Sequence, residues 1–310
     1  MESFQIRREL YTAEDLYDRF DPEDDSSYGR CYDALVYADV VKDGKRSRDL
    51  SVTLPRTIHD HSISSALFRF LADWAPSDVV GVMGGHAMKR SDPAYRKVAL
   101  VSKKLTEQGK LMVSGGGPGA MEATHFGAWM AGRGDDELDE ALRILQDADT
   151  FADKGWLSTA FRVRERFPQK QYRSLGIPTW LYGHEPPTPF ATHIAKYFEN
   201  SIREDNILTI AVGGVIFSPG SAGTLQEVFQ ETAQDHYKTC DVSSPIVFFG
   251  KEFWQKTVPL YPFLDSLMKS GYYKDLLLSI HDDPEDIIRE ILSFHPDMPR
   301  TAQHGKLTLK

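Results

Sequence analysis

Two glycine-rich turns in this sequence have residue types that bind phosphate groups. The first covers residues 115–119 (GGGPG), and the second covers residues 219–224 (PGSAGT). Each turn follows a short apolar run, at 111–113 and at 215–217, and precedes a stretch with helical character. Glycines let backbone N–H groups approach an anion, and the first turn of a helix adds partial positive charge. Together the two turns predict one phosphorylated ligand, such as a nucleotide, held from two sides.

The second turn also brings a carboxylate close to the predicted phosphate site. Thr224 and Glu227 have the spacing of a capping box, in which Thr224 is the helix N-cap and Glu227 bonds back to its backbone. That structural role accounts for both residues on spacing alone. In the functional alternative, Glu227 lies in the first helical turn beside the ligand, where a carboxylate could orient a water molecule or a sugar hydroxyl. The spacing leaves both interpretations open.

Two common nucleotide-binding motifs are absent from the sequence. The first turn does not fit G-x-G-x-x-G cleanly, and no acidic residue closes a strand about 20 positions later, as a dinucleotide site needs. No Gly-Lys-Ser/Thr step follows either turn, as a P-loop requires. We therefore expect neither a dinucleotide-binding site of the usual kind nor an NTPase.

The bulk composition is that of a globular protein. The chain has 310 residues, of which 41% are hydrophobic and 26% charged, and its net charge of -9 argues against a general nucleic-acid binder. Two cysteines, Cys31 and Cys240, are sparse enough to favour a reducing compartment. The N-terminus has no signal-peptide core, and no segment approaches the roughly 20 apolar residues of a membrane span. We expect a soluble cytoplasmic protein without a membrane partner.

Short apolar runs alternate with helical patterns from residue 79 onward, which predicts a doubly wound, Rossmann-like α/β fold with helices on both faces of a parallel sheet. The carboxyl ends of such strands form the ligand crevice, and Gly84 and Gly85 follow the first of them. Predicted strands cover 36–41, 79–83, 111–113, 179–182, 215–217 and 246–249; predicted helices cover 63–74, 92–108, 118–132, 190–202, the stretch from the second turn to 237, 252–269 and 284–294.

The predicted domain organisation has one catalytic domain and an N-terminal extension. The extension covers 1–75, the nucleotide-binding domain covers 76–300, and 301–310 form a tail. Residues 133–178 interrupt the alternation and are either a surface insertion or a lid that brings cations to a phosphorylated substrate. His59-Asp60-His61 could suggest a metal site, but it lacks a third spaced ligand, so a surface loop is the better interpretation.

Three motifs in order resemble the LOG-type phosphoribohydrolases, which are often misnamed lysine decarboxylases. Residues 219–227 resemble the family signature P-G-G-x-G-T-x-x-E, and 115–122 resemble its G-G-G-x-x-G-x-M region. The sequence 117–121 (GPGAM) and the sequence 185–189 (EPPTP) are closer to the bacterial nucleotide 5′-monophosphate nucleosidases of that family. The resemblance covers about residues 78–295.

This resemblance implies hydrolysis of the N-glycosidic bond of nucleoside 5′-monophosphates, with a purine or purine-like base, to free base and ribose 5-phosphate. It assigns catalysis to Arg203 and Glu227, needs no metal and no cofactor, and implies a homo-oligomer, a dimer or larger. A non-catalytic nucleotide-binding or sensor module, or a carrier of a phosphorylated cofactor, is the alternative. The residues expected to bind substrate or phosphate are Gly84, Gly85, Gly115, Gly116, Gly117, Gly119, Met121, Glu122, Glu185, Gly220, Ser221, Ala222, Gly223 and Thr224.

The sequence departs from the family pattern around the second turn. Ser221 replaces the second glycine, and Ser218 makes the step from strand to loop one residue longer. Glu204 replaces the lysine that commonly follows the catalytic arginine, and Gln226 replaces the first acid of a common pair. These changes leave Arg203 and Glu227 in place, although Glu204 could pair with Arg203 and weaken its role.

Overall fold

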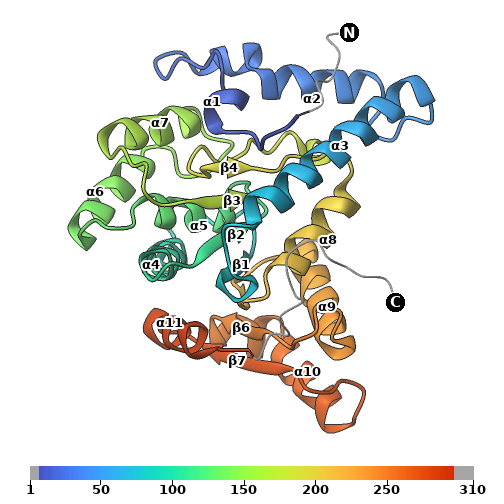
Figure 1. Cartoon of the computed structure of the whole chain (residues 1–310). Helices are drawn as coiled ribbons and strands as arrows, with labels where there is room; N and C mark the ends of the chain where they lie inside the picture. The colour runs from blue at the N-terminus through green and yellow to red at the C-terminus, as the bar shows by residue number, and fades with distance from the viewer. Residues whose placement is uncertain (1–6, 297–310) are drawn as a thin grey trace.

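A computed structural model of the chain describes residues 7–296. Within this range, seven strands form one sheet in which all neighbouring strands are parallel, in the order β4-β3-β2-β1-β5-β6-β7 (Figure 1). The strand order turns in opposite directions on the two sides of β1, which confirms the predicted doubly wound α/β fold. The strands are β1 (Val79–Met83), β2 (Leu111–Ser114), β3 (Ser174–Gly176), β4 (His193–Ile194), β5 (Val215–Phe217), β6 (Pro245–Phe249) and β7 (Leu277–His281).

Alternate side chains of the central strand face two different layers of helices. Val79 and Met83 belong to a buried cluster that includes residues of α3, α8 and α9, whereas Val80 and Val82 pack with residues of α4, α5 and α11. Because both faces are covered, all of β1 is buried and its sequence is one apolar run.

The helices are α1 (Ala13–Leu16), α2 (Tyr32–Lys42), α3 (Leu50–Leu71), α4 (Pro93–Glu107), α5 (Ala120–Trp129), α6 (Asp135–Leu145), α7 (Trp156–Arg166), α8 (Asn200–Ile210), α9 (Ala222–Tyr237), α10 (Leu260–Lys269) and α11 (Pro284–Ser293).

Helix α4 illustrates how local sequence signals set the boundaries of an element. Asp92 caps its start by accepting a hydrogen bond from the Ala94 amide, and Pro93 occupies the first turn. Gly109 follows its end with a φ of 85°, a conformation that glycine adopts without strain. The predicted helix at 92–108 is therefore confirmed to within a residue at each end.

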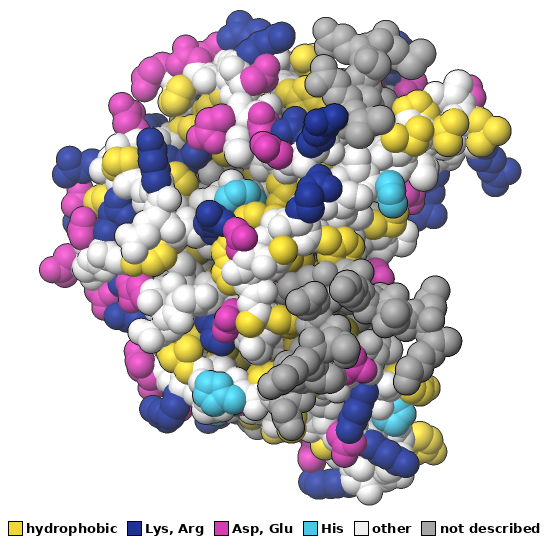
Figure 2. Space-filling view, in the orientation of Figure 1, with side chains coloured by type: hydrophobic (Ala, Val, Ile, Leu, Met, Phe, Trp, Pro, Cys, Tyr) yellow, Lys and Arg dark blue, Asp and Glu magenta, His cyan; other side chains and the backbone are white. Residues whose placement is uncertain are grey.

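The N-terminal segment packs against the β4 edge of the sheet. Tyr11 bridges Ile194 of β4 through two backbone hydrogen bonds, and residues of α1, α2 and α3 share a buried cluster with the sheet. The predicted strand at 36–41 is wrong, because these residues belong to α2 and bury Val36 and Val40 on one helical face. Figure 2 shows hydrophobic side chains gathered at the tip of the α2–α3 hairpin, where Leu50 and Leu54 are exposed.

Two further predicted elements are wrong for related reasons. The predicted helix at 190–202 is instead a loop, the short strand β4 and the beginning of α8. Apolar residues four positions apart fit one face of a strand as well as one face of a helix, so their spacing did not distinguish the two. The predicted strand at 179–182 is a short 3-10 helix, Trp180–Tyr182, preceded by an isolated bridge between Thr179 and Tyr197.

The C-terminal part of the fold differs from the prediction in detail. The predicted helix at 252–269 divides into a π-helical turn, Phe253–Thr257, and α10, with Pro259 between them. The half-buried edge strand β7 was not predicted, whereas the predicted helix at 284–294 is confirmed as α11. The predicted tail at 301–310 lies outside the described residues.

Residues 133–178 form α6, α7 and β3, held to the domain by Arg90. The guanidinium of Arg90 is buried and donates hydrogen bonds to the carbonyls of Leu145, Ala148 and Trp156. It also donates to the Thr159 hydroxyl and, through two hydrogen bonds, to the carboxylate of Glu122 in α5. The stretch from α6 to the start of α7 is thus fixed to the loop after β1 and to α5.

Candidate functional site

The second glycine turn ends in a helix start that no side chain caps. Helix α9 begins at Ala222 with Ser221 at its N-cap position, and no side-chain capping hydrogen bond is formed there. Of the two interpretations left open for Thr224 and Glu227, the capping box is therefore wrong: the helix begins at Ala222, so Thr224 lies within its first turn. First-turn amides of a helix have no intrahelical acceptor, which makes them a site for an anion. Gly220 must be a glycine, because a Cβ there would lie 2.1 Å from Thr224 Oγ1.

Glu227 faces Arg203 across the crevice. Arg203 Nη1 lies 3.7 Å from Glu227 Oε1, and the two side chains are 13% and 11% exposed. Burial raises the pKa of Glu227 to about 7, with the positive charge of Arg203 lowering it and the negative charge of Glu204 raising it. The carboxylate can therefore exchange a proton near neutral pH, as a general base does.

A hydrogen bond to the chain just after β3 holds the Arg203 side chain in place. Its Nε donates a hydrogen bond of 3.0 Å to the Ile177 carbonyl, directly after β3. A Cβ at Gly115 would lie 2.4 Å from Arg203 Nη2, so the first turn leaves room for the guanidinium. Glu204 does not take this cation: its carboxylate accepts hydrogen bonds from Asn200 and Gln226. The expected competition between Glu204 and Glu227 for Arg203 is therefore not observed.

The loop after β1 joins the two glycine turns. The Gly85 amide donates to the Pro219 carbonyl at 3.0 Å, and the Gly85 carbonyl accepts from the Ala120 amide at 3.1 Å. A Cβ at Gly84 would lie 1.9 Å from Ser218 Oγ and 2.7 Å from Ala120 Cβ. The three loops after β1, β2 and β5 therefore meet at the point where the strand order reverses, which is where doubly wound sheets bind ligands.

The first turn contributes less to the cavity than its glycine content suggests. Gly115 and Met121 line the cavity, whereas Gly116 packs against Gly176 and Pro178, and Gly119 against the backbone of the loop after β1. Gly117 lies against the Met121 side chain, where a Cβ would come within 2.8 Å. Most glycines of this turn thus serve close packing, and the exposed helix start is at the second turn.

Glu122 does not lie at the cavity. Its carboxylate is buried in the ion pair with Arg90, where the two side chains are each 1% exposed. Both oxygens of the carboxylate accept hydrogen bonds from Arg90, so the group is not available to a ligand, and removal of either partner would leave a buried charge uncompensated. The expected binding role of Glu122 is therefore not supported.

Glu185 and two histidines are placed beside the glycine turns. Glu185 Oε1 lies 3.6 Å from His86 Nδ1 and 3.8 Å from His184 Nε2, and its side chain is 18% exposed. Tyr182 also lines the cavity and is 47% exposed. Tyr182 was not predicted to lie at the site, because residues 179–182 were expected to form a strand, and Gln226 was not predicted as a cavity residue either.

The whole cavity has a volume of 360 Å³, within the range of about 300–1,000 Å³ of small-molecule sites. Among the residues predicted to act or bind there, it contains Gly84, Gly85, Gly115, Met121, Glu185, Arg203, Ser221, Ala222, Gly223, Thr224 and Glu227. Its other lining residues are Val82, Met83, His86, Tyr182, Glu204 and Gln226.

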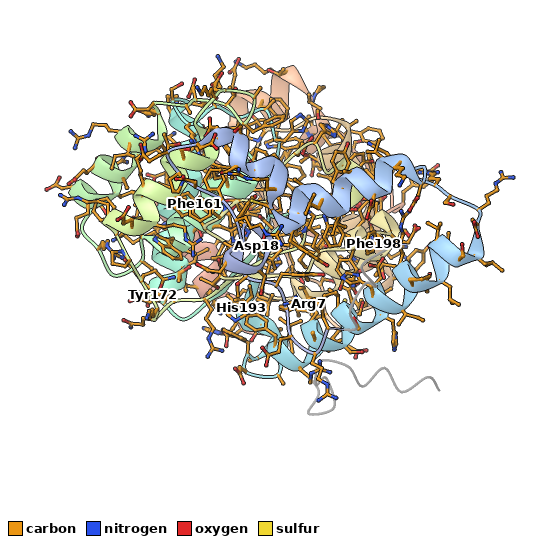
Figure 3. The ribbon with its side chains drawn as sticks, turned by 90° about the horizontal axis from the view of Figure 1, so that it is seen from above. Arg7, Asp18, Phe161, Tyr172, His193 and Phe198 are labelled. Atoms are coloured by element: carbon orange, nitrogen blue, oxygen red, sulfur yellow. The ribbon has the colours of Figure 1, made fainter. Side chains whose placement is uncertain are left out.

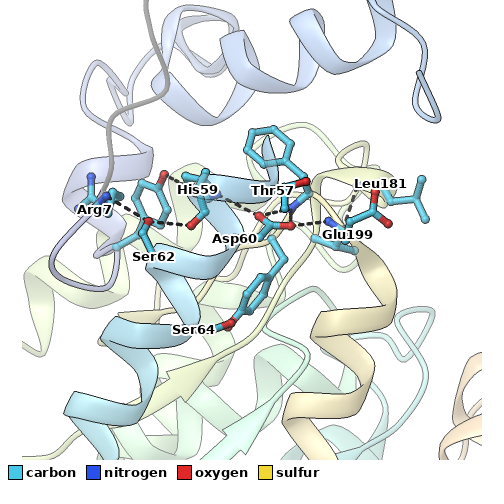
Figure 4. Close-up of polar contacts among 12 residues, drawn as sticks. Arg7, Thr57, His59, Asp60, Ser62, Ser64, Leu181 and Glu199 are labelled. Atoms are coloured by element: carbon cyan, nitrogen blue, oxygen red, sulfur yellow. Dashed lines mark hydrogen bonds and ion pairs between the residues drawn. The ribbon is translucent and has the colours of Figure 1, made fainter. Parts of the chain in front are cut away.

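The His59-Asp60-His61 motif belongs to the support of this site and is not a surface loop. His59 and Asp60 are buried in α3, and His59 bonds to Tyr11 Oη at 2.8 Å (Figure 4). Asp60 accepts hydrogen bonds from the amides of Phe198 and Glu199, immediately before α8 (Figure 4). Asp60 thus fixes the start of the helix that carries Arg203. In residues 7–296, no three His, Cys, Asp or Glu side chains are grouped to hold a metal ion.

No helix in residues 7–296 is long and apolar enough to cross a membrane.

Comparisons with known proteins give only weak structural matches. No family model matches the chain, and no curated protein sequence matches it. A molybdenum cofactor binding protein from the phototrophic bacterium Rippkaea orientalis is 14% identical, with a TM-score of 0.42, over 69% of this chain and 95% of its own. The molybdenum cofactor carrier protein of Chlamydomonas reinhardtii is 15% identical, with a TM-score of 0.41, over 70% and 99%. Likeness of this degree assigns no ligand and no activity to the chain.

Proposed function

We propose that this protein hydrolyses the N-glycosidic bond of nucleoside 5′-monophosphates and belongs to the LOG-type phosphoribohydrolases that its motifs resemble. The observation that supports this most is the Arg203–Glu227 pair beside an uncapped helix start. A module that only holds a phosphate needs the helix start but has no need for a buried carboxylate next to it.

The 5′-phosphate binds at the start of α9. Backbone amides of the first helical turn and the hydroxyl of Ser221 supply donors, and the partial positive charge of the helix end favours the anion. Ser221 lines the cavity, so the departure from the family glycine adds a donor. Binding energy from this remote phosphate positions the sugar for reaction.

Glu227 and Arg203 act at the ribose. Breaking the bond between C1′ and the base nitrogen develops oxocarbenium character on the sugar, which a nearby carboxylate stabilises. Glu227 accepts a proton from a water molecule as the water oxygen bonds to C1′. The electron pair of the broken bond leaves with the base, whose nitrogen takes a proton from solvent. Arg203 positions Glu227 and the substrate oxygens through its N–H groups.

The test is incubation of the protein with AMP, GMP, CMP, UMP and a cytokinin ribotide, with free base measured by chromatography. We expect release from at least one of them, and a loss of about 100-fold or more in kcat for Glu227→Gln, the scale of a general base. Arg289→Gln and Glu252→Gln, at residues 74% and 76% exposed by side chain, are matched controls that should keep full activity. No release by the wild-type protein would contradict the proposal.

A carrier of a phosphorylated cofactor is the second candidate. The backbone amides of the second turn and the Ser221 hydroxyl favour a carrier, since they can bind a phosphate group without any contribution from Glu227. Such a protein would bind AMP or another phosphorylated ligand in calorimetry and return it intact. Glu227→Gln would then leave the affinity unchanged, whereas Ser221→Pro would weaken it.

A further inference from the structure

A second and larger cavity, of 580 Å³, shares no lining residue with the pocket at the glycine turns. Arg173 lies directly before β3 and Thr192 directly before β4, so the cavity opens at the amino ends of these strands. The glycine turns follow the carboxyl ends of the sheet strands, at the opposite edge. Figure 3 labels Phe161, Tyr172 and His193 of this cavity, which lie together on one side of the molecule.

The walls of this cavity are aromatic. Trp129, Phe161 and Tyr172 contribute rings, and the guanidinium carbon of Arg164 lies 4.8 Å from the Trp129 ring centre and 5.4 Å from that of Phe161. The indole N–H of Trp129 is already bonded to the Phe167 carbonyl. Aromatic faces and a stacked guanidinium favour a flat ring as the occupant.

The charges around the cavity favour an anion. Arg164, Lys170 and Arg173 line it, against the carboxylates of Glu14 and Glu165. The lining side chains thus carry one excess positive charge on a chain whose net charge is -9. Arg173 also pairs at 2.9 Å with Asp73, whose side chain is 65% exposed and does not line the cavity. Burial and the nearby Arg173 lower the pKa of His193 to about 4, so the histidine is neutral at pH 7 and adds no charge.

Two of the three guanidinium nitrogens of Arg164 lack an acceptor among the described residues. Its Nε and Nη1 are buried without a hydrogen-bond partner among the described residues, and Nη2 pairs with Glu14. The side chain of Glu14 is 70% exposed, so this pair is open to exchange with an anion from solvent. Lys170 is exposed and lines the cavity as a second cation.

We propose that this cavity binds a small planar aromatic molecule carrying a carboxylate or a phosphate group. The ring lies between Phe161 and Tyr172, and the anionic group pairs with Arg164, Arg173 and Lys170. The site is independent of the proposed nucleotide hydrolysis, since it uses none of the residues of that pocket.

Calorimetric titration of the full chain with 2-naphthoate, 1-naphthyl phosphate and the neutral 2-naphthamide tests this proposal. We expect at least one anion to bind at least tenfold more tightly than the amide, and the tighter of the two identifies the preferred anionic group. R164Q and R173Q should each weaken binding about tenfold. The matched control is R162Q, since Arg162 is exposed on the same helix and does not line the cavity.

Each of the following results would overturn the proposal: no binding of either anion at millimolar concentration, equal binding of the amide, or equal weakening by R162Q. Circular dichroism of each variant guards against misfolding, and R173Q provides a second test because Arg173 is exposed. Sedimentation would reveal a second copy of the chain in the cavity, as a dimer that R164Q dissociates, and this would also overturn the proposal. AMP hydrolysis by R164Q is measured in parallel. Because Arg164 does not line the nucleotide pocket, the hydrolysis result bears on the proposed function of that pocket and not on the ligand proposed for this cavity.

Discussion

Glu227 is buried beside Arg203, and burial makes its charge depend on pH near neutrality. The pKa of Glu227 rises from 4.5 to about 7 in the folded protein. The folded state therefore binds this proton more tightly than the unfolded chain does, and its ionisation lowers stability as the pH rises from about 4.5 to about 7.

We expect Glu227→Gln to raise the free energy of unfolding by about 1–3 kcal/mol at pH 8 and by much less at pH 4.5. Urea titrations at both pH values measure the difference. Glu252→Gln, at a residue with a 76% exposed side chain, should change neither value. An effect of Glu227→Gln that is equal at the two pH values would show that its charge is not the cause.

Gly84 supports the crevice through its lack of a side chain. A Cβ at this position would meet Ser218 Oγ at 1.9 Å and Ala120 Cβ at 2.7 Å, so the loops after β1, β2 and β5 would have to separate. We expect Gly84→Ala to lower the free energy of unfolding by about 1–3 kcal/mol, as overpacking does, and to weaken AMP binding. Gly29→Ala is the matched control, since a Cβ there has no heavy atom within 4 Å. Urea denaturation and calorimetry measure the two effects, and unchanged values for Gly84→Ala would refute the close packing.

At the scale of elements, α3 positions α8 through one carboxylate. Asp60 accepts hydrogen bonds from the buried Phe198 amide and the partly buried Glu199 amide, and Asp60→Ala would remove both bonds. We expect a loss of about 1–3 kcal/mol in stability and a fall in kcat for AMP hydrolysis with little change in KM, because Arg203 shifts with its helix. Asp60→Asn should restore part of kcat, since its amide oxygen accepts one of the two bonds. His61→Ala, at the exposed neighbour, is the control. An unchanged kcat in Asp60→Ala would exclude the positioning role.

Prediction from the sequence succeeded where elements carry a local signal. Strands β1, β2, β5 and β6 and helices α4, α9 and α11 have apolar runs or stripes bounded by glycine, proline or capping residues. It failed at 36–41 and 190–202, where apolar residues four positions apart fit both a strand and a helix. The Arg203–Glu227 contact follows from the resemblance together with the fold, whereas the role of Asp60 depends on a contact 138 residues apart that no local pattern encodes.

At the scale of the whole molecule, the N-terminal segment is part of the folded domain. Its residues from Leu10 to Leu71 contribute to the same buried cluster as β1, β2 and β5. We expect a segment that shares its core with the sheet to unfold together with it. The predicted division at residue 75 therefore separates two regions of the sequence that are packed on one core.

A fully buried ion pair of Lys196 and Asp33 links these two regions. Both side chains are fully buried, and Asp33 also accepts a hydrogen bond of 2.9 Å from the Trp180 indole. Lys196→Met alone leaves a buried carboxylate without its cation, and we expect it to cost about 3–5 kcal/mol in the free energy of unfolding. The double variant Asp33→Leu/Lys196→Met removes both charges and should recover most of that loss.

Urea denaturation monitored by tryptophan fluorescence and by circular dichroism measures both variants, and coincident single transitions are expected for the wild type. A double variant that is as unstable as Lys196→Met would show that the pair stabilises the fold through more than charge compensation, and two separate wild-type transitions would contradict the shared core.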